Sequence, residues 1–368
     1  MEWKYTTHRP LGMEEATKKL KHGEMSTALE SPADVDIIRT DTVRVGSVTR
    51  VEDDLSWGRM TKGKIDNWRG WATSSILRNY LHKYVGRKLD QLSAEDLDDP
   101  GAIEAAINSG LCALLALYDP ERSTLHVAGA GDSRAVLGRQ RQDENGDWVS
   151  IPLSVDHSGT YPDERARINA EHPGEDLLFS AIGRFLGSEV TQSFGDHRQE
   201  WPREALEEWK NGFFGRVYNS NIKTPPFSTA LPDVRDIQVQ PGDLIILRTD
   251  GFWNHVSNED AVYFVQLWIE TQAKDRANNL EQAENIYLEK EPADIVPTPE
   301  KEPERHMYPY SWEMEQEAFI VEHDNIATHL VHNALGEKER DLFCSVMSLL
   351  SPDSKEARDD VTVIFVLF

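Results

Sequence analysis

The sequence predicts an α+β fold built on antiparallel β-sheet. Two strand-like runs, Leu111–Asp119 and Ser123–Gly131, flank a turn at residues 120–122, and a third run follows at Ala135–Gln140. Consecutive short strands joined by tight turns indicate antiparallel pairing, because parallel strands need a longer crossover connection.

The composition is that of a folded, acidic protein. Of its 368 residues 39% are hydrophobic and 9% aromatic, and 64 acidic residues against 39 basic ones give a net charge of −25. That charge argues against nucleic acid or an anionic membrane as the main partner. Cys112 and Cys344 both lie in apolar runs and are expected to be reduced core residues.

The sequence also bears on location in the cell. No run approaches the length of a membrane span, and the first twenty residues lack both a signal-peptide core and a transit pattern. We therefore expect a soluble intracellular protein, cytoplasmic by default.

The predicted domain organisation is one folded domain, residues 36–368, after a polar leader, residues 1–35. The leader contains one short helical pattern at Met13–Lys21. Residues 278–310 are charged and contain proline, which is typical of a solvated insertion within a domain.

In the first half of the domain, Asp36–Arg50 alternates Val, Ile and Thr with polar residues, as half-buried strands do. Ser56–Ile65 is polar and interrupted by glycine, which makes it a poor core strand. An amphipathic helix is predicted over Ile76–Val85. After the three strands described above, residues 141–153 contain an Asn-Gly turn and predict a further hairpin.

In the second half, Leu153–Ile168 is predicted to pass from strand through loop to helix, and Ile237–Arg248 to be strand-like around a Pro-Gly turn. Helical patterns follow at Trp312–Leu335 and Lys338–Leu350. The C-terminal run Val361–Phe368 is almost wholly apolar and β-branched, which predicts a central strand.

The segment that joins a buried strand to a helix carries the first candidate site residue. Asp243–Arg248 has the apolar, β-branched character of a strand, and Asp250 follows in a Thr-Asp-Gly turn. A helix start comes next, with Ser257 as its cap and Asp260 at the capping-box spacing. Asp250 therefore projects from a buried strand end, where a carboxylate is costly without a partner. A divalent cation is one such partner, and a plain Asp-Gly turn is the alternative.

Other acids stand in the same setting. Asp53, Asp66, Asp132 and Asp359, like Asp250, each lie at the edge of a strand-like run. Each one alone is explained equally well as a solvated surface acid. Several together suit a binuclear site, because Mg²⁺ and Mn²⁺ favour carboxylate and water oxygens.

Several sequence blocks carry a resemblance to a known family. In chain order they are GAGDSRAVLG, LSVDHSG, GRFLGSEVTQSFGD, LPDV, PGDLIILRTDGFWNHVSNEDAV and RDDVTVIFV. They resemble the signature blocks of the metal-dependent type-2C (PPM-type) protein phosphatases, over roughly residues 40–368. The TQSFGD block, the KTPPF loop and the acidic insertion are most similar to the pyruvate dehydrogenase phosphatase branch and its fungal relatives. The resemblance implies a four-layer αββα sandwich, in which two antiparallel sheets are flanked by helices.

The resemblance also implies a metal site and a mechanism. In the family, two Mn²⁺ or Mg²⁺ ions share a bridging water that attacks the phosphoester directly. By matching position, Asp66 would bridge both ions, and Asp250 and Asp359 would hold one of them; these three form the expected catalytic set.

The remaining metal-site assignments follow from the same match. Glu52 or Asp53 would act through bound water, and Asp132 would serve a weaker third ion. Asn67 would offer its backbone carbonyl.

This chain departs from the family pattern at the first metal block. The family reads Asp-Gly-His there, but Asn67 and Trp68 follow Asp66 in this sequence. The histidine is thought to protonate the leaving alkoxide, and an indole cannot do so. Loss of such a group costs about 10²–10⁴-fold in rate.

Further departures lie elsewhere. Gln192 stands where the family usually has Arg, and Asn254 where many members have Asp. Val48 occupies the position of the usual phosphate-binding Arg, with Arg50 nearby but out of register. His157 is an alternative proton donor, although its family counterpart is a structural loop residue.

The main functional hypothesis is a Mn²⁺/Mg²⁺-dependent protein serine/threonine phosphatase, slower than its relatives, with a phosphorylated protein as substrate. The alternative is a catalytically silent pseudophosphatase that binds a phosphoprotein or regulates a partner. A third hypothesis keeps the metal site for chemistry on a small molecule, and the departures between Ser56 and Asn108 also fit a damaged gene copy. A mitochondrial location would follow from the branch, and the sequence leaves the oligomeric state open.

Overall fold

The computed structural model describes residues 11–28, 39–46, 110–141, 146–175, 177–195, 197–204, 206–207, 223–253, 255–280, 319–336, 339–350, 354 and 357–368. Predictions for Asp36–Ile38, for residues 47–109 and for the acidic insertion at 281–310 lie outside these residues.

The larger of two main sheets has six strands in the order β1-β2-β11-β10-β6-β7, with every neighbouring pair antiparallel. The strands are β1 (Met25–Ala28), β2 (Arg39–Val45), β6 (Arg134–Gln140), β7 (Trp148–Pro152), β10 (Leu244–Arg248) and β11 (Val361–Leu367). β11 lies between β2 and β10, so the predicted central C-terminal strand is confirmed. β7 pairs with β6, which confirms the further hairpin.

The second sheet has three antiparallel strands in the order β4-β5-β9. They are β4 (Ala113–Asp119), β5 (Thr124–Ala130) and β9 (Asp233–Gln238). The predicted β4–β5 hairpin is confirmed, with Asp119 opposite Thr124 at its turn. Two short strands, β3 (Gly110–Leu111) and β8 (Phe194–Gly195), pair with each other and form a separate two-stranded sheet.

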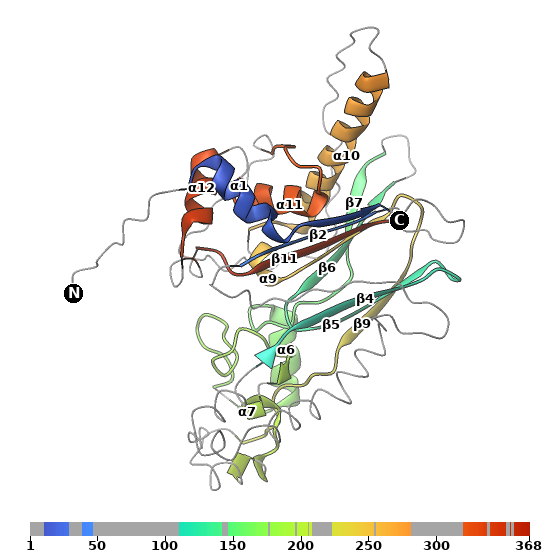
Figure 1. The fold of residues 1–368 in the computed structure, drawn as a ribbon. Coiled ribbons are helices and arrows are strands. Elements are labelled where there is room, and N and C mark those ends of the chain that lie inside the picture. The colour runs from blue at the N-terminus through green and yellow to red at the C-terminus, as the bar shows by residue number, and fades with distance from the viewer. Residues whose placement is uncertain are drawn as a thin grey trace, which may run out of the picture.

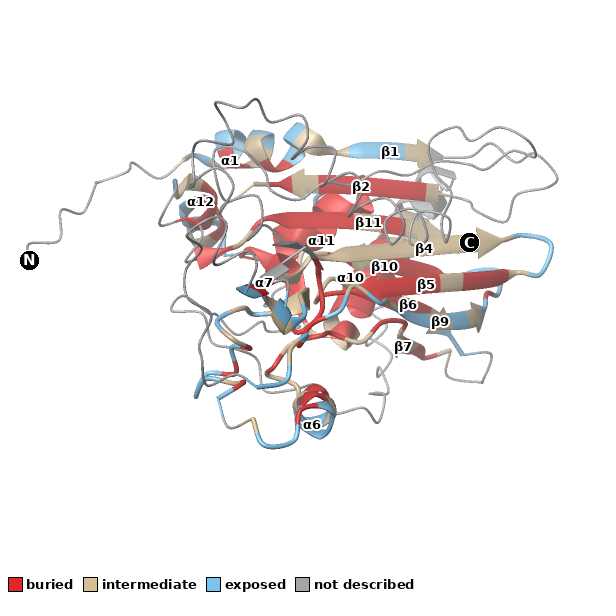
Figure 2. Ribbon diagram, turned by 90° about the horizontal axis from the view of Figure 1, so that it is seen from below, coloured by how far each residue is buried: buried red, intermediate tan, exposed pale blue. Residues whose placement is uncertain are grey.

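The two sheets pack face to face through one apolar layer. Leu125 and Val127 of β5 meet Leu137 of β6 and Ile245 of β10 in a single buried cluster. Figure 2 shows the buried strands β5, β6 and β10 close together in the middle of the molecule. The predicted α+β architecture of two packed antiparallel sheets is therefore confirmed.

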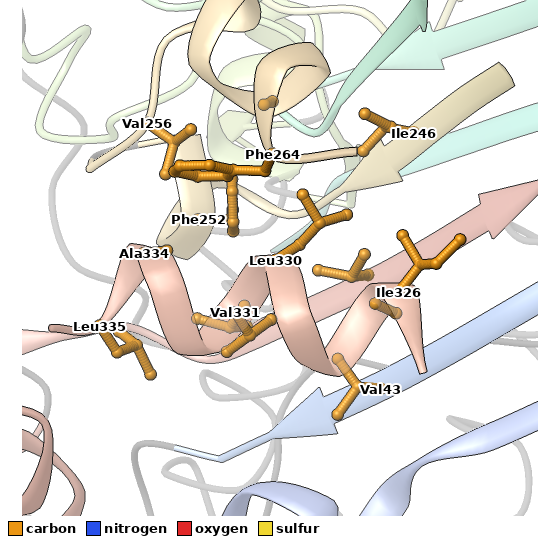
Figure 3. Packing of buried hydrophobic residues seen from close by; sticks show 14 of the residues in the cluster. Val43, Ile246, Phe252, Val256, Phe264, Ile326, Leu330, Val331, Ala334 and Leu335 are labelled. Atoms are coloured by element: carbon orange, nitrogen blue, oxygen red, sulfur yellow. The ribbon is translucent and has the colours of Figure 1, made fainter. Parts of the chain in front are cut away.

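Helices cover the other face of the larger sheet (Figure 1). They are α1 (Met13–Leu20), α10 (Asn258–Leu280), α11 (Ile326–Ala334) and α12 (Arg340–Ser348). Leu330 and Val331 of α11 pack with Phe264 of α10 against Val43 and Ile246 of the sheet (Figure 3). The helix predicted at Ile76–Val85 lies outside the described residues.

Three further α-helices of the described residues are α6 (Pro162–Glu171), α7 (His197–Glu200) and α9 (Asp250–Trp253). α10 begins where the capping box predicts. The Asp260 backbone N–H donates to Ser257 Oγ at 3.0 Å, and that hydroxyl donates to the Asp260 carboxylate at 2.6 Å.

The helix predicted at Trp312–Leu335 begins later than its periodicity suggests. Residues 319–325 are not helical, and α11 starts after Asn325, whose side chain accepts the Thr328 N–H at 2.8 Å. Asn333 holds the preceding chain by accepting from the Ile320 N–H at 2.9 Å and donating to the Ile320 carbonyl at 3.0 Å. The helix prediction is wrong for residues 319–325, which are irregular and are held at Ile320 by these side-chain bonds.

Part of the predicted leader packs into the fold. Ala16 and Leu20 of α1 are fully buried in the core between sheet and helices, and β1 pairs with the edge of β2. The polar composition of residues 1–35 did not indicate this packing, and the boundary at residue 36 stays a prediction. In the part of the chain that the structure describes, every helix is too short or too polar to cross a membrane.

Candidate active site

Three of the predicted acids lie at the same end of three adjacent strands of the larger sheet. We refer to this end of the sheet as the carboxylate edge. β10 pairs antiparallel with both β6 and β11, so the end of β10 lies beside the starts of its two neighbours. Asp250 comes two residues after β10, Asp132 two residues before β6, and Asp359 two residues before β11. The register therefore brings all three to the same edge.

The turn that carries Asp250 packs directly against the chain at Asp359. Thr249 donates its N–H to the Thr362 carbonyl at 3.2 Å and its hydroxyl to the Asp360 carbonyl at 3.3 Å. A Cβ added to Gly251 would lie 2.3 Å from that same Asp360 carbonyl oxygen. Glycine is needed at this position because any side chain would collide with neighbouring backbone.

We expect Gly251→Ala to destabilise the protein by about 2 kcal/mol or more, since overpacking against backbone is costly. Gly12→Ala is the matched control, because nothing lies within 4 Å of a Cβ added there. Urea unfolding of both variants measures the effect. An unchanged midpoint for Gly251→Ala would mean that the Asp250 turn and the Asp359 segment are not in contact.

Asp132 is half-buried, with other acids nearby. Burial, together with Asp156 and Glu189 nearby, raises the pKa of its carboxyl to about 6. The Cys112 thiol donates to Asp132 Oδ1 at 3.3 Å. Burial and then the charges of Asp132 and Asp250 raise the pKa of that thiol. Mutually repelling carboxylates are an arrangement that a bound cation relieves.

Cys112 itself differs from its prediction. Both cysteines are free thiols, and Cys344 is buried, but Cys112 is only half-buried and bonded to Asp132. The apolar run around Cys112 belongs to β4, and the residue stands just before that strand, at the carboxylate edge.

Arg134 connects several segments next to the carboxylate edge. Arg134 is paired with Asp156, with a shortest contact of 2.6 Å, and also donates to Tyr161 Oη at 2.8 Å and to Asn258 Oδ1 at 3.0 Å. Its guanidinium carbon lies 4.8 Å from the ring centre of Trp253. These contacts tie the loop after β7 to the starts of β6 and α10, next to Asp132.

His157 has structural bonds on both ring nitrogens. Its Nδ1 accepts the Gly131 N–H at 3.1 Å, so Nε2 carries the proton and donates to Asp233 at 2.9 Å. The ring is buried, and the Gly131 carbonyl also accepts the His157 N–H. This arrangement fixes the backbone next to Asp132 and favours the structural interpretation of His157 over the proton donor.

Gln192 has a local reason to replace arginine. The buried amide donates to the Leu231 carbonyl at 2.9 Å and accepts from Arg167 Nη2 at 3.2 Å. Arg167 also pairs with Glu164 at 2.6 Å, and Thr191 donates to the same carboxylate. A second arginine at position 192 would face Arg167 and repel it.

Arg248 was not singled out from the sequence. It is buried at the end of β10, with its guanidinium carbon 3.5 Å from the ring centre of Phe252 and 4.8 Å from that of Trp253. Its nitrogens meet no hydrogen-bond acceptor among the described residues. Burial first, and the neighbouring Arg134 second, hold its pKa well below the usual value. The one feature of the sequence that could have indicated this residue is its position as a charged residue at the end of an apolar run.

The other predicted site residues lie outside the part of the chain that the structure describes. These are the metal-site residues and the departures from the family pattern: Glu52, Asp53, Asp66, Asn67, Val48, Arg50, Trp68 and Asn254. Within the described ranges, no three His, Cys, Asp or Glu side chains form a group that could hold a metal ion. Asp132, Asp250 and Asp359 supply hard oxygen donors at one edge, which fits Mg²⁺ or Mn²⁺ as part of a larger ligand set.

The chain is similar to several known proteins. The family model described as "Protein phosphatase 2C" matches residues 74–286. A protein phosphatase 2C homolog of Schizosaccharomyces pombe is 30% identical, over 96% of this chain and 84% of its own length. A solved serine-threonine phosphatase 2C from Toxoplasma gondii covers 92% of this chain and 87% of its own, at 15% identity and a TM-score of 0.36.

The mitochondrial [pyruvate dehydrogenase [acetyl-transferring]]-phosphatase 1 of Saccharomyces cerevisiae is 34% identical over 71% of this chain. That match spans 46% of the yeast protein, which is less than half of its length. The family match and the similarity to the fission yeast protein along nearly the whole chain show that this chain belongs to the protein phosphatase 2C family.

Proposed function

We propose that the protein is a Mn²⁺/Mg²⁺-dependent phosphatase that hydrolyses phosphoserine and phosphothreonine in protein substrates. The observation that carries the proposal is the position of Asp132, Asp250 and Asp359 at one edge of the larger sheet, in a chain of this family. Family membership supports the reaction class, and the carboxylate edge supports the place where it occurs.

The residues that would hold the metal ions come from five segments of the chain. Asp250 and Asp359 would bind one ion, Asp66 would bridge two, and Asp132 would serve a weaker third. Glu52 or Asp53 would contribute through water, and Asn67 through its carbonyl. When bound, such ions supply Lewis-acid stabilisation of phosphoryl charge and lower the pKa of water at the site.

Other residues of the chain would hold these carboxylates in position. Gly251 and Thr249 keep the Asp250 turn against Asp360, and His157 fixes the backbone beside Asp132. A carboxylate set held by backbone contacts keeps its geometry without reorganising during the reaction. The net charge of −25 leaves cations as the natural ligands of this edge.

A second candidate is a pseudophosphatase, which binds a phosphoprotein without turnover. Trp68 favours it, because indole cannot donate a proton to the leaving alkoxide. The same substitution in an active enzyme would instead give attenuated catalysis. The sequence of the first metal block thus keeps Asp66 and lacks one proton donor.

Trp68→His separates these two candidates. We expect the wild-type protein with Mn²⁺ to hydrolyse a phosphopeptide slowly, and Trp68→His to be about 10²-fold faster, because a positioned general acid contributes at least that factor. An aryl phosphate, whose leaving group needs no proton, should respond less to the variant.

The controls for this assay are metal-free protein and a test of metal binding. Wild-type protein that shows no turnover on either substrate, yet melts at higher temperature with Mn²⁺, would establish the pseudophosphatase. A phosphorylated pyruvate dehydrogenase peptide belongs among the substrates, because the yeast relative is named for that activity.

A further inference from the structure

A single carboxylate fastens the chain after α6 to residues 223–224. Glu175 Oε1 accepts the backbone N–H groups of Lys223 and Thr224, the latter at 2.8 Å, and the Thr224 hydroxyl at 3.0 Å. The Lys223 ammonium donates in turn to the Gly174 carbonyl at 2.9 Å. We refer to these contacts between residues 174–175 and 223–224 as the Glu175 clasp.

The Thr224 hydroxyl is the central group of the clasp. A carboxylate can only accept, so the hydroxyl proton goes to Glu175. His172 Nδ1 lies 3.1 Å from the same oxygen and must therefore donate to it. The hydroxyl serves as donor to one neighbour and as acceptor for the other.

The clasp closes a small apolar core next to the carboxylate edge. Phe227, three residues after Thr224, is buried with Ile168 and Phe185, and its ring centre lies 4.8 Å from that of His172. Ser228 donates to the Thr191 carbonyl at 3.0 Å. The Thr191 N–H donates to the carbonyl of His157, the residue that fixes the backbone beside Asp132. A continuous set of contacts thus links the clasp to the candidate site.

We propose that Thr224 is a phosphorylation site for a proline-directed protein kinase and that its phosphorylation opens the Glu175 clasp. Thr224 is exposed and is followed by Pro225, the residue that such kinases require after the acceptor. In the reaction, Thr224 Oγ1 bonds to the γ-phosphorus of a nucleoside triphosphate, and the bond from that phosphorus to the nucleoside diphosphate breaks. The hydroxyl proton passes to a base of the kinase.

Phosphorylation opens the clasp because it reverses the chemistry of its central group. The ester oxygen has no proton for Glu175, and the phosphate places a charge of about −2 beside that carboxylate. Two cationic side chains of the described residues beside the clasp already have partners, Lys223 in the Gly174 carbonyl and Arg203 in the Lys223 carbonyl at 3.0 Å. Repulsion and the lost hydrogen bond therefore act in the same direction.

The kinase must also act on the open form. The kinase active site needs the Thr224 hydroxyl free of Glu175 and His172. It therefore modifies only those molecules in which the clasp is open, and the phosphate then prevents the clasp from closing again. Anything that weakens the clasp should consequently speed the modification.

The test is phosphorylation of the purified full chain by a proline-directed kinase with ATP, followed by mass spectrometry of the Thr224 peptide. We expect phosphate on Thr224 in the wild type and none in Pro225→Ala. Glu175→Ala should be modified at least about fivefold faster, the factor that corresponds to one hydrogen bond. Glu171→Ala is the matched control, because Glu171 pairs with Arg167 and not with the clasp.

Hydrogen exchange of the phosphorylated protein supplies the second measurement. The amides of Lys223 and Thr224 should exchange about tenfold faster after modification, since both lose their carboxylate acceptor. Failure of Thr224 to be labelled, while a peptide of residues 219–230 is labelled, would overturn the proposal, and so would labelling with unchanged exchange. Running the assay also in Asp250→Asn separates absent modification from self-dephosphorylation, so the result does not depend on the proposed function.

Discussion

Asp250→Asn is expected to lower Mn²⁺-dependent phosphatase activity by about 10³-fold or more, because metal-held charge supplies several kcal/mol to the transition state. The variant should stay folded. Asp250 Oδ1 accepts the Gly251 N–H at 2.9 Å, and the amide oxygen of asparagine can accept the same bond. What the substitution removes is the negative charge and one metal-binding oxygen.

Two readouts are needed for this variant. Initial rates on a phosphopeptide measure the activity, and the Mn²⁺-induced rise in melting temperature measures binding, because a ligand of the folded state stabilises it. Asp236→Asn is the control, since Asp236 is an exposed residue of β9 that pairs with His126. Full activity and an unchanged Mn²⁺ response in Asp250→Asn would exclude Asp250 as a metal ligand.

The strands of the fold were predictable because their patterns are local. β11 is a continuous apolar run, and the β4–β5 hairpin is two strands around a short polar turn. Segments held by specific side chains were not predictable in the same way. Residues 319–325 belong to a run with a helical pattern but are irregular, and Asn333 bonds the backbone of Ile320 there.

The same contrast between local patterns and tertiary contacts applies to the candidate site. Asp132, Asp250 and Asp359 were identified because each follows or precedes a strand, and a shared sheet edge follows from strand pairing. The contact between Cys112 and Asp132 depends on where β4 and β5 begin and end, and sequence spacing does not fix that. Burial of Arg248 against aromatic rings also depends on tertiary packing.

Acid is expected to unfold the protein through three buried histidines around α11. His323 Nε2 lies 2.6 Å from His332 Nδ1, so one ring donates to the other. His329 Nε2 donates to the Phe264 carbonyl at 2.9 Å, and its Nδ1 accepts from Asn333 at 3.2 Å. An added proton on an accepting nitrogen would make two N–H groups face each other in the core.

The pKa values reflect this environment. Burial, followed by His332 and Lys21, lowers the pKa of His323 to about 3. Burial also lowers the pKa of His329 to about 4, despite the favourable carbonyl of Phe264. For His332, burial and then His329 and Arg340 lower the pKa to about 4.

The sign of the pH effect follows from these values. In the unfolded chain the histidines titrate near pH 6.5, so below that pH the unfolded state binds more protons than the folded state. The free energy of unfolding is then highest above pH 6.5 and falls as the pH drops towards 4. As the pH falls from 6.5 towards 4, the three groups together lower the free energy of unfolding by about 5 kcal/mol, after a discount for the coupled His323–His332 pair. That loss is comparable with the whole stability of a domain.

Urea unfolding at several pH values between 7 and 4.5 measures this loss, and His329→Gln isolates one contribution. Glutamine can still donate to the Phe264 carbonyl but does not titrate, so the variant should lose about half as much stability as the wild type over that interval. His22→Gln, at an exposed position outside the core, should keep the wild-type slope. Most carboxylates weaken proteins only below about pH 5. Asp132, whose pKa is raised to about 6, takes up a proton first in the folded state and so opposes the loss, but one group offsets only part of the effect of three histidines. A wild-type free energy that stays constant from pH 6.5 to 5.5 would therefore mean that the three imidazoles are not neutral core groups of the folded state.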